Sequence, residues 1–435
     1  MRSGWLVFGV HLAIFALTWS SGAQHALADV SWRLDSRFRY GLRVGEPMGL
    51  ATLQHQAAML SEGPIGDSWS FQLGARIRGD GAYTVAKHHF AELEKQDPPE
   101  VLLREANLEY RTGDWILRIG SQVFTWGEAF GSFFADVVNP KDFREAGFGE
   151  IRDLSDPVEA VNLIYAQSEW SLQAVYLPFY RANKLPYPSS DFFPLALADR
   201  FRGMTIDFDQ SENPTNNDGD LGLRARVQLG AFDVAFFGFS QTDRQPIFLV
   251  TPTSLTQARI RTKSSRLQTY GGTMTWAGDR FVVRGEILKN INRSFNVLQN
   301  SLLNPLGEIE GEQDIFVLGL DWPWNSGRLK GWQAGVQASY DRVSIPQVFG
   351  RRETEWSIGA QLFKDPETGT RYKFFGALSG ADGSWLFQAS AMSPYGRNFE
   401  MGWETWLFGG ERDSQFGSLK KSSRVMWVIK GVFGG

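Results

Sequence analysis

Residues 30–44 alternate between apolar and polar side chains along their whole length. A period of two is that of a β-strand with one apolar and one polar face. The segment is longer than a typical strand of about 5–6 residues, and its polar face carries four arginines. The pattern therefore predicts a strand with lipid on one side and a water-filled lumen on the other, as in an outer-membrane barrel. The predicted lipid face consists of Val30, Trp32, Leu34, Ser36, Phe38, Tyr40, Leu42 and Val44.

The same alternation recurs as far as the C-terminus, and the connections between the strands alternate in length. Clear repeats lie at 69–78, 221–229, 332–341 and 356–362, and weaker ones at 371–380, 384–393, 398–408 and 423–433. Tight turns, such as 112–114 and 230–231, alternate with long segments. Short periplasmic turns and long external loops are the outer-membrane arrangement. The long segments are 84–100, 127–158, 179–219, 242–257, 290–312, 343–353 and 409–422.

The strand count depends on residues 51–61, whose composition also suits a helix. From residue 69 onward the pattern gives about 16 strands, and segment 30–44 makes that number odd, whereas bacterial barrels have even numbers. A strand at 51–61 restores the parity. We therefore predict an all-β, antiparallel transmembrane barrel of about 18 strands, with about 16 as the alternative. Segment 423–433 is expected to pair with 30–44, and a ring of this size leaves an aqueous lumen unless something fills it.

The first 28 residues have the pattern of an export signal. Arg2 supplies a positive charge, an apolar stretch follows from Trp5 to Trp19, and Ala26-Leu27-Ala28 is a small-residue cleavage site. A membrane-anchor helix is less favoured because the apolar stretch is short. We expect Sec-type export, a barrel domain at 29–435, and a location in the outer membrane of a Gram-negative bacterium.

The amino-acid composition narrows the range of expected binding partners. Cysteine is absent, which excludes disulfides and cysteine–metal sites, and the net charge of −4 gives no basic domain for nucleic acid. Aromatic residues make up 14% of the chain, which is typical of barrels with aromatic girdles. The expected partners are outer-membrane lipid, lipopolysaccharide, the barrel-assembly machinery and a small-molecule solute, and a homo-oligomer is left open.

Residues 102–158 carry a more distinctive motif set. A hairpin at 104–120 precedes Trp126-Gly127-Glu128, a charged run from Asp136 to Glu145, and Asp153. This set, with a proline-rich loop at 177–194, resembles a Gram-negative outer-membrane family catalogued as domain of unknown function thirteen-oh-two. The resemblance implies a channel or transporter similar in architecture to alginate-export and general porins, with no established substrate. The loop at 84–100 is shorter than family members often have.

Segment 124–158 is the candidate constriction of the pore. Its phenylalanines and valines at 130–138 favour burial, and its charges need partners. Folding back into the lumen would satisfy both demands and narrow the pore. Two other interpretations stay open: the charges pin the loop to the wall, or they form a specific solute site. The candidate residues are Lys141, Asp142, Arg144, Glu145, Arg152 and Asp153.

Charged residues in the polar phase of the strands form a candidate ladder along the lumen. Opposed charges there make passage depend on the charge of the solute, although pairs between neighbouring strands could equally brace the wall. Arginines outnumber acids, which favours anionic or polar solutes. The ladder consists of Arg33, Arg37, Arg39, Arg43, Arg76, Arg78, Glu105, Glu109, Arg118, Arg224 and Arg226.

Catalysis is not expected. The chain has five histidines, and His11 and His25 lie in the export signal. No histidine stands near a nucleophile motif, so we predict no catalytic residue, no cofactor and no metal site. The sequence favours a porin-like channel for passive passage of small polar or anionic solutes. A transporter of hydrophobic or lipid-like compounds is the alternative, because of the phenylalanines at 130–138 and 192–193. A surface receptor or adhesin that uses the external loops is the second alternative.

Overall fold

The computed structural model describes residues 30–44, 48–86, 93, 97–130, 133–145, 151–193, 205–209, 219–254, 257–298, 306–366 and 369–435. The predicted export signal lies outside the described residues. Eighteen strands form one antiparallel sheet, and three more form a separate small sheet.

The wall of the molecule is built from strands that follow one another in chain order. Each pairs with the next, so that the ring contains every wall strand once. They are β1 (Ser31–Arg43), β2 (Leu50–Ile65), β3 (Trp69–Asp80), β4 (Glu100–Thr112), β5 (Trp115–Gln122), β6 (Val158–Ala166), β7 (Trp170–Leu177), β9 (Asp220–Leu229), β10 (Phe232–Thr242), β13 (Arg266–Ala277), β14 (Val282–Leu298), β15 (Leu306–Pro323), β16 (Trp332–Val343), β17 (Thr354–Lys364), β18 (Arg371–Ser379), β19 (Trp385–Tyr395), β20 (Phe399–Gly409) and β21 (Arg424–Gly434).

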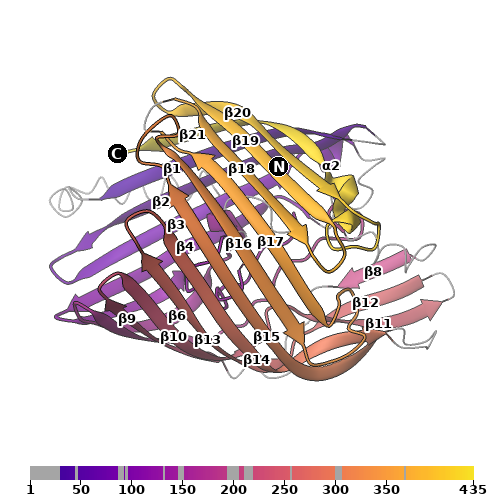
Figure 1. The fold of residues 1–435 in the computed structure, drawn as a ribbon, viewed down its shortest axis with the longest axis horizontal. Helices are drawn as coiled ribbons and strands as arrows, with labels where there is room; N and C mark the ends of the chain where they lie inside the picture. Colours follow the sequence, from indigo (N-terminus) through magenta and orange to yellow (C-terminus); the bar gives the residue numbers. More distant parts are fainter. Residues whose placement is uncertain are drawn as a thin grey trace, which may run out of the picture.

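The ring closes between the first and the last strand. β1 pairs with β2 on one side and with β21 on the other, so Arg37 lies opposite both Gln56 and Lys430. The predicted count of 18 is confirmed, and the ambiguous segment around 51–61 is strand β2. Figure 1 shows the tilted strands curving round into a ring, with parts of the connecting loops lying within it.

Helices are short and lie in the connections. They are α2 (Ala82–Val85), α4 (Ile151–Leu154) and the 3₁₀ helix η1 (Gly417–Ser422). Among the described residues, no helix has the length and apolar character needed to cross a membrane.

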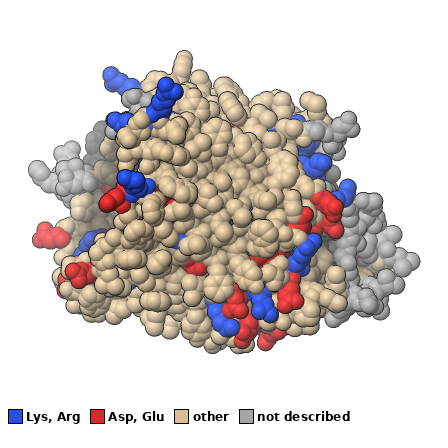
Figure 2. Space-filling model, viewed as in Figure 1, with Lys and Arg blue, Asp and Glu red and all other residues tan. Residues whose placement is uncertain are grey.

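The two faces of the strands follow the predicted alternation. On β1 the side chains of Trp32, Tyr40 and Leu42 are exposed on the outer wall, whereas Arg39 and Arg43 are buried on the inner side. The face of the molecule drawn in Figure 2 has a broad central zone with few charges, and the charged side chains gather towards its margins. This is the surface expected of a wall that lies in lipid.

Three of the long connections, 179–219, 242–257 and 290–312, were predicted as loops and instead contain strands. β11 (Ile247–Ser254) and β12 (Gln257–Lys263) form a hairpin inside 242–257 and just beyond it, and β8 (Thr205–Asp209) pairs with β12 in parallel. Segment 290–312 contains the ends of β14 and β15, which stay paired up to Leu298 and Leu306. These parts project from one end of the ring (Figure 1), so neither face has to be lipid-compatible, and a search for a lipid face misses them. The small sheet stands beside the extended ends of β14 and β15 (Figure 1).

Candidate functional site

The described residues of the stretch 124–156, namely 124–130, 133–145 and 151–156, lie inside the barrel and are here called the inner segment. The clearest marker is Glu286, whose carboxylate faces the lumen from β14. It accepts hydrogen bonds from the backbone N–H groups of Glu128 at 2.5 Å, Ala129 at 2.8 Å and Ala135 at 3.2 Å. A side chain of the wall therefore supplies the hydrogen-bond acceptor for backbone N–H groups that would otherwise be unpaired inside the barrel.

Two more wall strands hold the tip of the inner segment. The side-chain amide of Gln337 on β16 accepts from the N–H of Phe130 at 3.0 Å and donates to its carbonyl at 2.9 Å. The Phe130 ring meets Phe375 of β18 edge-on, with ring centroids 6.3 Å apart. The inner segment thus reaches at least three strands of this wall.

Apolar packing fixes the same part of the inner segment against the wall. Trp126 is 1% exposed, and its ring lies 5.2 Å from Phe237 and 5.9 Å from Phe239, both of which point inward from β10. Of the phenylalanines and valines at 130–138 that were predicted to be buried, Val138 is fully buried, whereas the three phenylalanines and Val137 are half-buried, with Phe134 and Val137 packed against this cluster. The cluster comprises Phe124, Trp126, Ala135, Val138, Val158, Ala160, Val175, Leu177, Phe237, Phe239, Leu288, Ile315 and Val317.

Ion pairs fix the other side of the inner segment to β1 and β3. Arg37 pairs with Asp153 at 2.9 Å, and Arg76 pairs with Asp156 at 3.2 Å. Arg78 bridges Asp142 and Glu145, each at 3.0 Å, and Arg39 also reaches Glu145, at 3.2 Å. β3 and β14 are eight places apart in the ring of eighteen. Contacts with both strands mean that the inner segment crosses the lumen.

A buried charge cluster surrounds Asp142 and Arg144. The guanidinium of Arg144 pairs with Asp142 at 2.6 Å, with Asp97 at 2.6 Å and with Glu100 at 2.7 Å. Burial alone raises the pKa of the Asp142 carboxyl, but Arg78 and Arg144 outweigh it and hold the pKa well below its usual range. Burial likewise raises the pKa of Glu145, and the cations Arg39, Arg78 and Arg424 outweigh it and lower the pKa to about 2. Both carboxylates are therefore charged at neutral pH.

Lys141 has a different position from its neighbours. It is 4% exposed and its ammonium contacts Asp136 at 3.0 Å and Ser155 at 2.9 Å, within the inner segment itself. Burial lowers the pKa of Lys141, against the opposing effect of Asp136. Of the six candidate constriction residues, Lys141, Asp142, Arg144, Glu145 and Asp153 lie in or against these clusters. The side chain of Arg152 lies outside the described ones.

The ladder residues divide into three groups. Five of the six on β1 and β3 hold loops that enter the lumen: Arg37, Arg39, Arg76 and Arg78 hold the inner segment, and Arg43 pairs with Asp191 at 2.7 Å. Others pair along the wall, Arg118 with Glu109 and Arg226 with Asp233, while Glu105 stands 3.7 Å from Arg104. Arg33 pairs with Asp35 near one end of the ring, and Arg224 has no ion pair within the described part of the chain. Bracing and lumen lining therefore both occur.

Sequence reasoning missed Arg104 and Glu100, which also face inward. The pairing of β3 with β4 shifts between Leu73 and Ala75, so the inward phase of β4 changes near Arg104. The sequence did contain a sign of this change of phase. The outward residues Val101 and Leu103 occupy odd positions, whereas the outward residue Leu108 occupies an even one. Nothing in the sequence indicated that Glu286, Asp191 and Arg424 would become anchors of these loops. Lys184 is a further anchor, which pairs with Glu100 and, at 2.7 Å, with Asp156.

Space remains inside the barrel beside the inner segment. One cavity of about 310 Å³ and another of about 220 Å³ share Arg37, Arg371 and Lys430 in their linings, so they adjoin. Lys373 also lines the larger one, is exposed there, and makes no ion pair among the described residues. A third cavity, of about 440 Å³, lies near Glu109 and Arg118.

The proline-rich loop is also anchored to the inner side of the wall. Asp191 pairs with Arg43 and with Arg424 at 3.4 Å, and the hydroxyl of Ser422 donates to the Asp191 carbonyl. The next residue, Phe192, is 4% exposed and packs on the inward side chains of β19–β21. This cluster comprises Phe192, Leu386, Met392, Trp406, Phe408, Leu419, Met426 and Val428.

Among the residues that the structure describes, no three His, Asp or Glu side chains gather where they could hold a metal ion. The geometry instead defines a class of protein: a closed antiparallel ring with an apolar outer wall and charged side chains inside is the fold of outer-membrane barrels. The family can now be stated. The chain belongs to DUF1302, described as a protein of unknown function, whose family model matches residues 86–380.

Solved structures support the fold. The chain is similar to Acinetobacter baumannii OccAB3, with 11% identity, a TM-score of 0.54, and coverage of 94% of this chain and 100% of that one. It is also similar to Pseudomonas aeruginosa OccK8 (OprE), with 8% identity, a TM-score of 0.54, and coverage of 94% and 98%. Pseudomonas aeruginosa OpdL gives 12% identity, a TM-score of 0.51, and coverage of 94% and 99%. A search of curated proteins finds no significant match.

Proposed function

We propose that this protein is an outer-membrane channel for passive passage of small polar or anionic solutes, and that it reaches the outer membrane after Sec-type export. The supporting observation is the pair of adjoining cavities of about 310 and 220 Å³ beside the inner segment. The inner segment fills one side of the lumen with apolar packing and leaves a charged space on the other. The inner segment then narrows the pore and is pinned to the wall by the same residues, because Arg37 and Arg39 hold the inner segment and also line the larger cavity.

The charges in that cavity favour anions. Its lining contains five inward-facing cations and two acids, Asp365 and Glu404. Three of the cations are also paired with acids outside this lining: Arg37 with Asp153, Arg39 with Glu145 and Arg371 with Glu400. A confined space lined by one sign of charge concentrates ions of the opposite sign. The five cations are Arg37, Arg39, Arg371, Lys373 and Lys430.

Planar-bilayer recordings test the proposal. Purified protein should give stable ion currents, and the reversal potential in a salt gradient should show anion preference. Lys373→Gln should reduce that preference, because its ammonium lies in the cavity without an ion pair among the described residues. The matched control is Lys289→Gln, which removes the same charge from the outer wall, where Lys289 pairs with Glu312. Absence of current, or equal effects of the two variants, would contradict the proposal.

One observation favours the alternative of a transporter for hydrophobic compounds. Met392 lines the larger cavity and also belongs to the apolar cluster around Phe192, so charged and apolar surfaces meet inside the lumen. Such a route also needs a lateral opening, whereas every wall strand is paired with both neighbours in the ring. Binding of apolar compounds without any ion current would support the transporter over the channel.

A further inference from the structure

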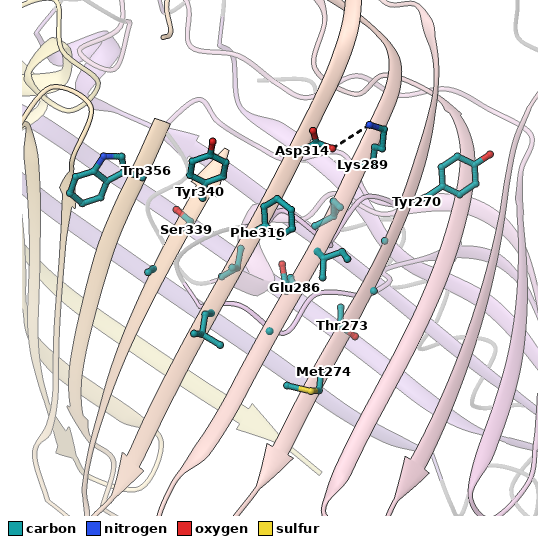
Figure 3. A pocket seen from close by; sticks show the side chains of 18 of the residues that line it. Tyr270, Thr273, Met274, Glu286, Lys289, Asp314, Phe316, Ser339, Tyr340 and Trp356 are labelled. Atoms are coloured by element: carbon teal, nitrogen blue, oxygen red, sulfur yellow. Dashed lines mark hydrogen bonds and ion pairs between the residues drawn. The ribbon is translucent and has the colours of Figure 1, made fainter. Parts of the chain in front are cut away.

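A hollow of about 1100 Å³ lies on the outer wall and not in the lumen. It runs over β10 and β13–β17, and Figure 3 shows it from close by. Its volume is slightly above the range of about 300–1,000 Å³ that is usual for ligand pockets. The lining is almost wholly apolar apart from one end, where Lys289 and Asp314 form an ion pair near Tyr270. We call this hollow the outer groove.

The outer groove exists because two neighbouring outward positions are glycines. Gly272 and Gly285 lie on β13 and β14, in the phase that faces lipid. Large side chains stand around them: Phe236 is 66% exposed and Leu318 is 62% exposed. At Gly285 no close contact demands glycine, because the nearest atom to an added Cβ would be 3.7 Å away. A larger side chain fits there, and its absence leaves the floor of the groove open.

The charged end of the outer groove is at the level of the aromatic side chains Tyr270, Tyr340 and Trp356. It points towards the long connections, which face the cell exterior in bacterial barrels. Lys289 lies opposite Tyr270 in the strand register, and Arg342 lies opposite Asp314. Arg342 is loosely held, with Glu353 at 3.9 Å, and its side chain is 57% exposed. Interfacial aromatics and cations at one end of an apolar groove match the headgroup level of a membrane.

We propose that the outer groove binds one acyl chain of lipid A, with a lipid A phosphate at Arg342 and Lys289. Lipid A is the acylated and phosphorylated lipid of the outer leaflet, the leaflet at this end of the wall. Glu312 and Asp314 share the charge of Lys289. Glu353 likewise shares the charge of Arg342. The phosphate therefore contributes less than the acyl chain, which gains packing contacts by filling a preformed hollow. A second copy of this chain is a poorer occupant, because an interface of ordinary size buries about 1,200–2,000 Å² and needs a ridge that fits the groove.

Two glycine variants provide a matched test. Gly285→Leu fills the outer groove. Gly376→Leu adds the same side chain on the outer wall of β18, outside the groove, where the nearest atom is also 3.7 Å from an added Cβ. Each protein is reconstituted with lipid A, or separately with phosphatidylethanolamine, and retained lipid is counted by native mass spectrometry after mild detergent exchange. Wild type and Gly376→Leu should retain lipid A, and Gly285→Leu should lose at least about tenfold in retention. The Lys289→Gln, Arg342→Gln double variant should lose less, about threefold.

The other outcomes overturn the proposal. Equal retention of lipid A in wild type, Gly285→Leu and Gly376→Leu would show that lipid A does not occupy the groove. Equal retention of phosphatidylethanolamine, with the same loss in Gly285→Leu, would show a general lipid site. A change of oligomeric state in Gly285→Leu alone would show that a second copy covers this wall.

Discussion

Arg37 of β1 donates a hydrogen bond to Asp153 of the inner segment, with Nη1 and Oδ2 2.9 Å apart. The two residues are 116 positions apart in the chain. Arg37 also lines both adjoining cavities. One side chain of the first strand therefore connects the wall, the folded-in segment and the open space between them.

Replacement of Arg37 by Gln should loosen the inner segment without unfolding the barrel. A hydrogen bond to a charged partner contributes about 1.5–3 kcal/mol when it is buried, and this pair is partly buried, so we expect about 1–2 kcal/mol. Limited proteolysis should cut within the inner segment faster than in wild type. Arg33→Gln is the control, because its partner Asp35 is also on β1 and the pair is solvent-exposed. Equal cleavage rates in the two variants would refute the anchoring role of Arg37.

Glu286→Ala should release the backbone around residues 128–135. The carboxylate accepts three backbone hydrogen bonds, and each buried N–H left without a partner costs about 1–3 kcal/mol. Hydrogen exchange at the amides of Glu128, Ala129 and Ala135 should therefore accelerate strongly. Glu286→Gln should have a smaller effect, because its carbonyl oxygen can still accept from Glu128 and Ala129. Glu404→Ala, another inward carboxylate, should leave these amides unchanged.

Phe192→Ala should widen the path through the lumen. Removal of a buried phenylalanine side chain costs about 3–5 kcal/mol, and here the loss falls on contacts between the proline-rich loop and β19–β21. Single-channel conductance should increase. Phe193→Ala is the neighbouring control, because Phe193 packs against Val250 and Ile260 of the small sheet. If both variants raise the conductance equally, the barrier is the position of the whole loop and not the Phe192 side chain.

Acid should weaken the anchoring of the inner segment. Asp142 and Glu145 have pKa values lowered by their arginine partners, that of Glu145 from 4.5 to about 2. A lowered folded-state pKa contributes stability above the ordinary pKa, and this contribution is lost as the pH falls through the folded-state value. Channel conductance should stay constant down to the ordinary Glu pKa of 4.5 and change as the pH falls towards about 2. In Glu145→Gln part of this change should already be present at neutral pH, and a flat profile in wild type would contradict the assignment.

The period-two pattern alone determined the architecture. Along β1, β3 and β16 successive side chains face lipid and the interior in turn. The requirement for an apolar side chain on the outer face therefore repeats at every second residue and is visible in a short stretch of sequence. Parity then assigned β2, whose composition was ambiguous. The apolar composition of 130–138 also indicated a loop that needs cover, because phenylalanine side chains in an external loop would meet water.

Only the tertiary structure determined which charged side chains form ion pairs with one another. Whether Arg76 braces a neighbouring strand or holds Asp156 depends on a distance between residues 80 positions apart, and alternation carries no information on that distance. The phase change near Arg104 and the outer groove over Gly272 and Gly285 likewise depend on how neighbouring strands are aligned. The sequence of β1 thus determined that its arginines point inward. Only the folded ring determined that they hold the segment inside it, because Coulomb and hydrogen-bond energies depend on position in space and not on position in the chain.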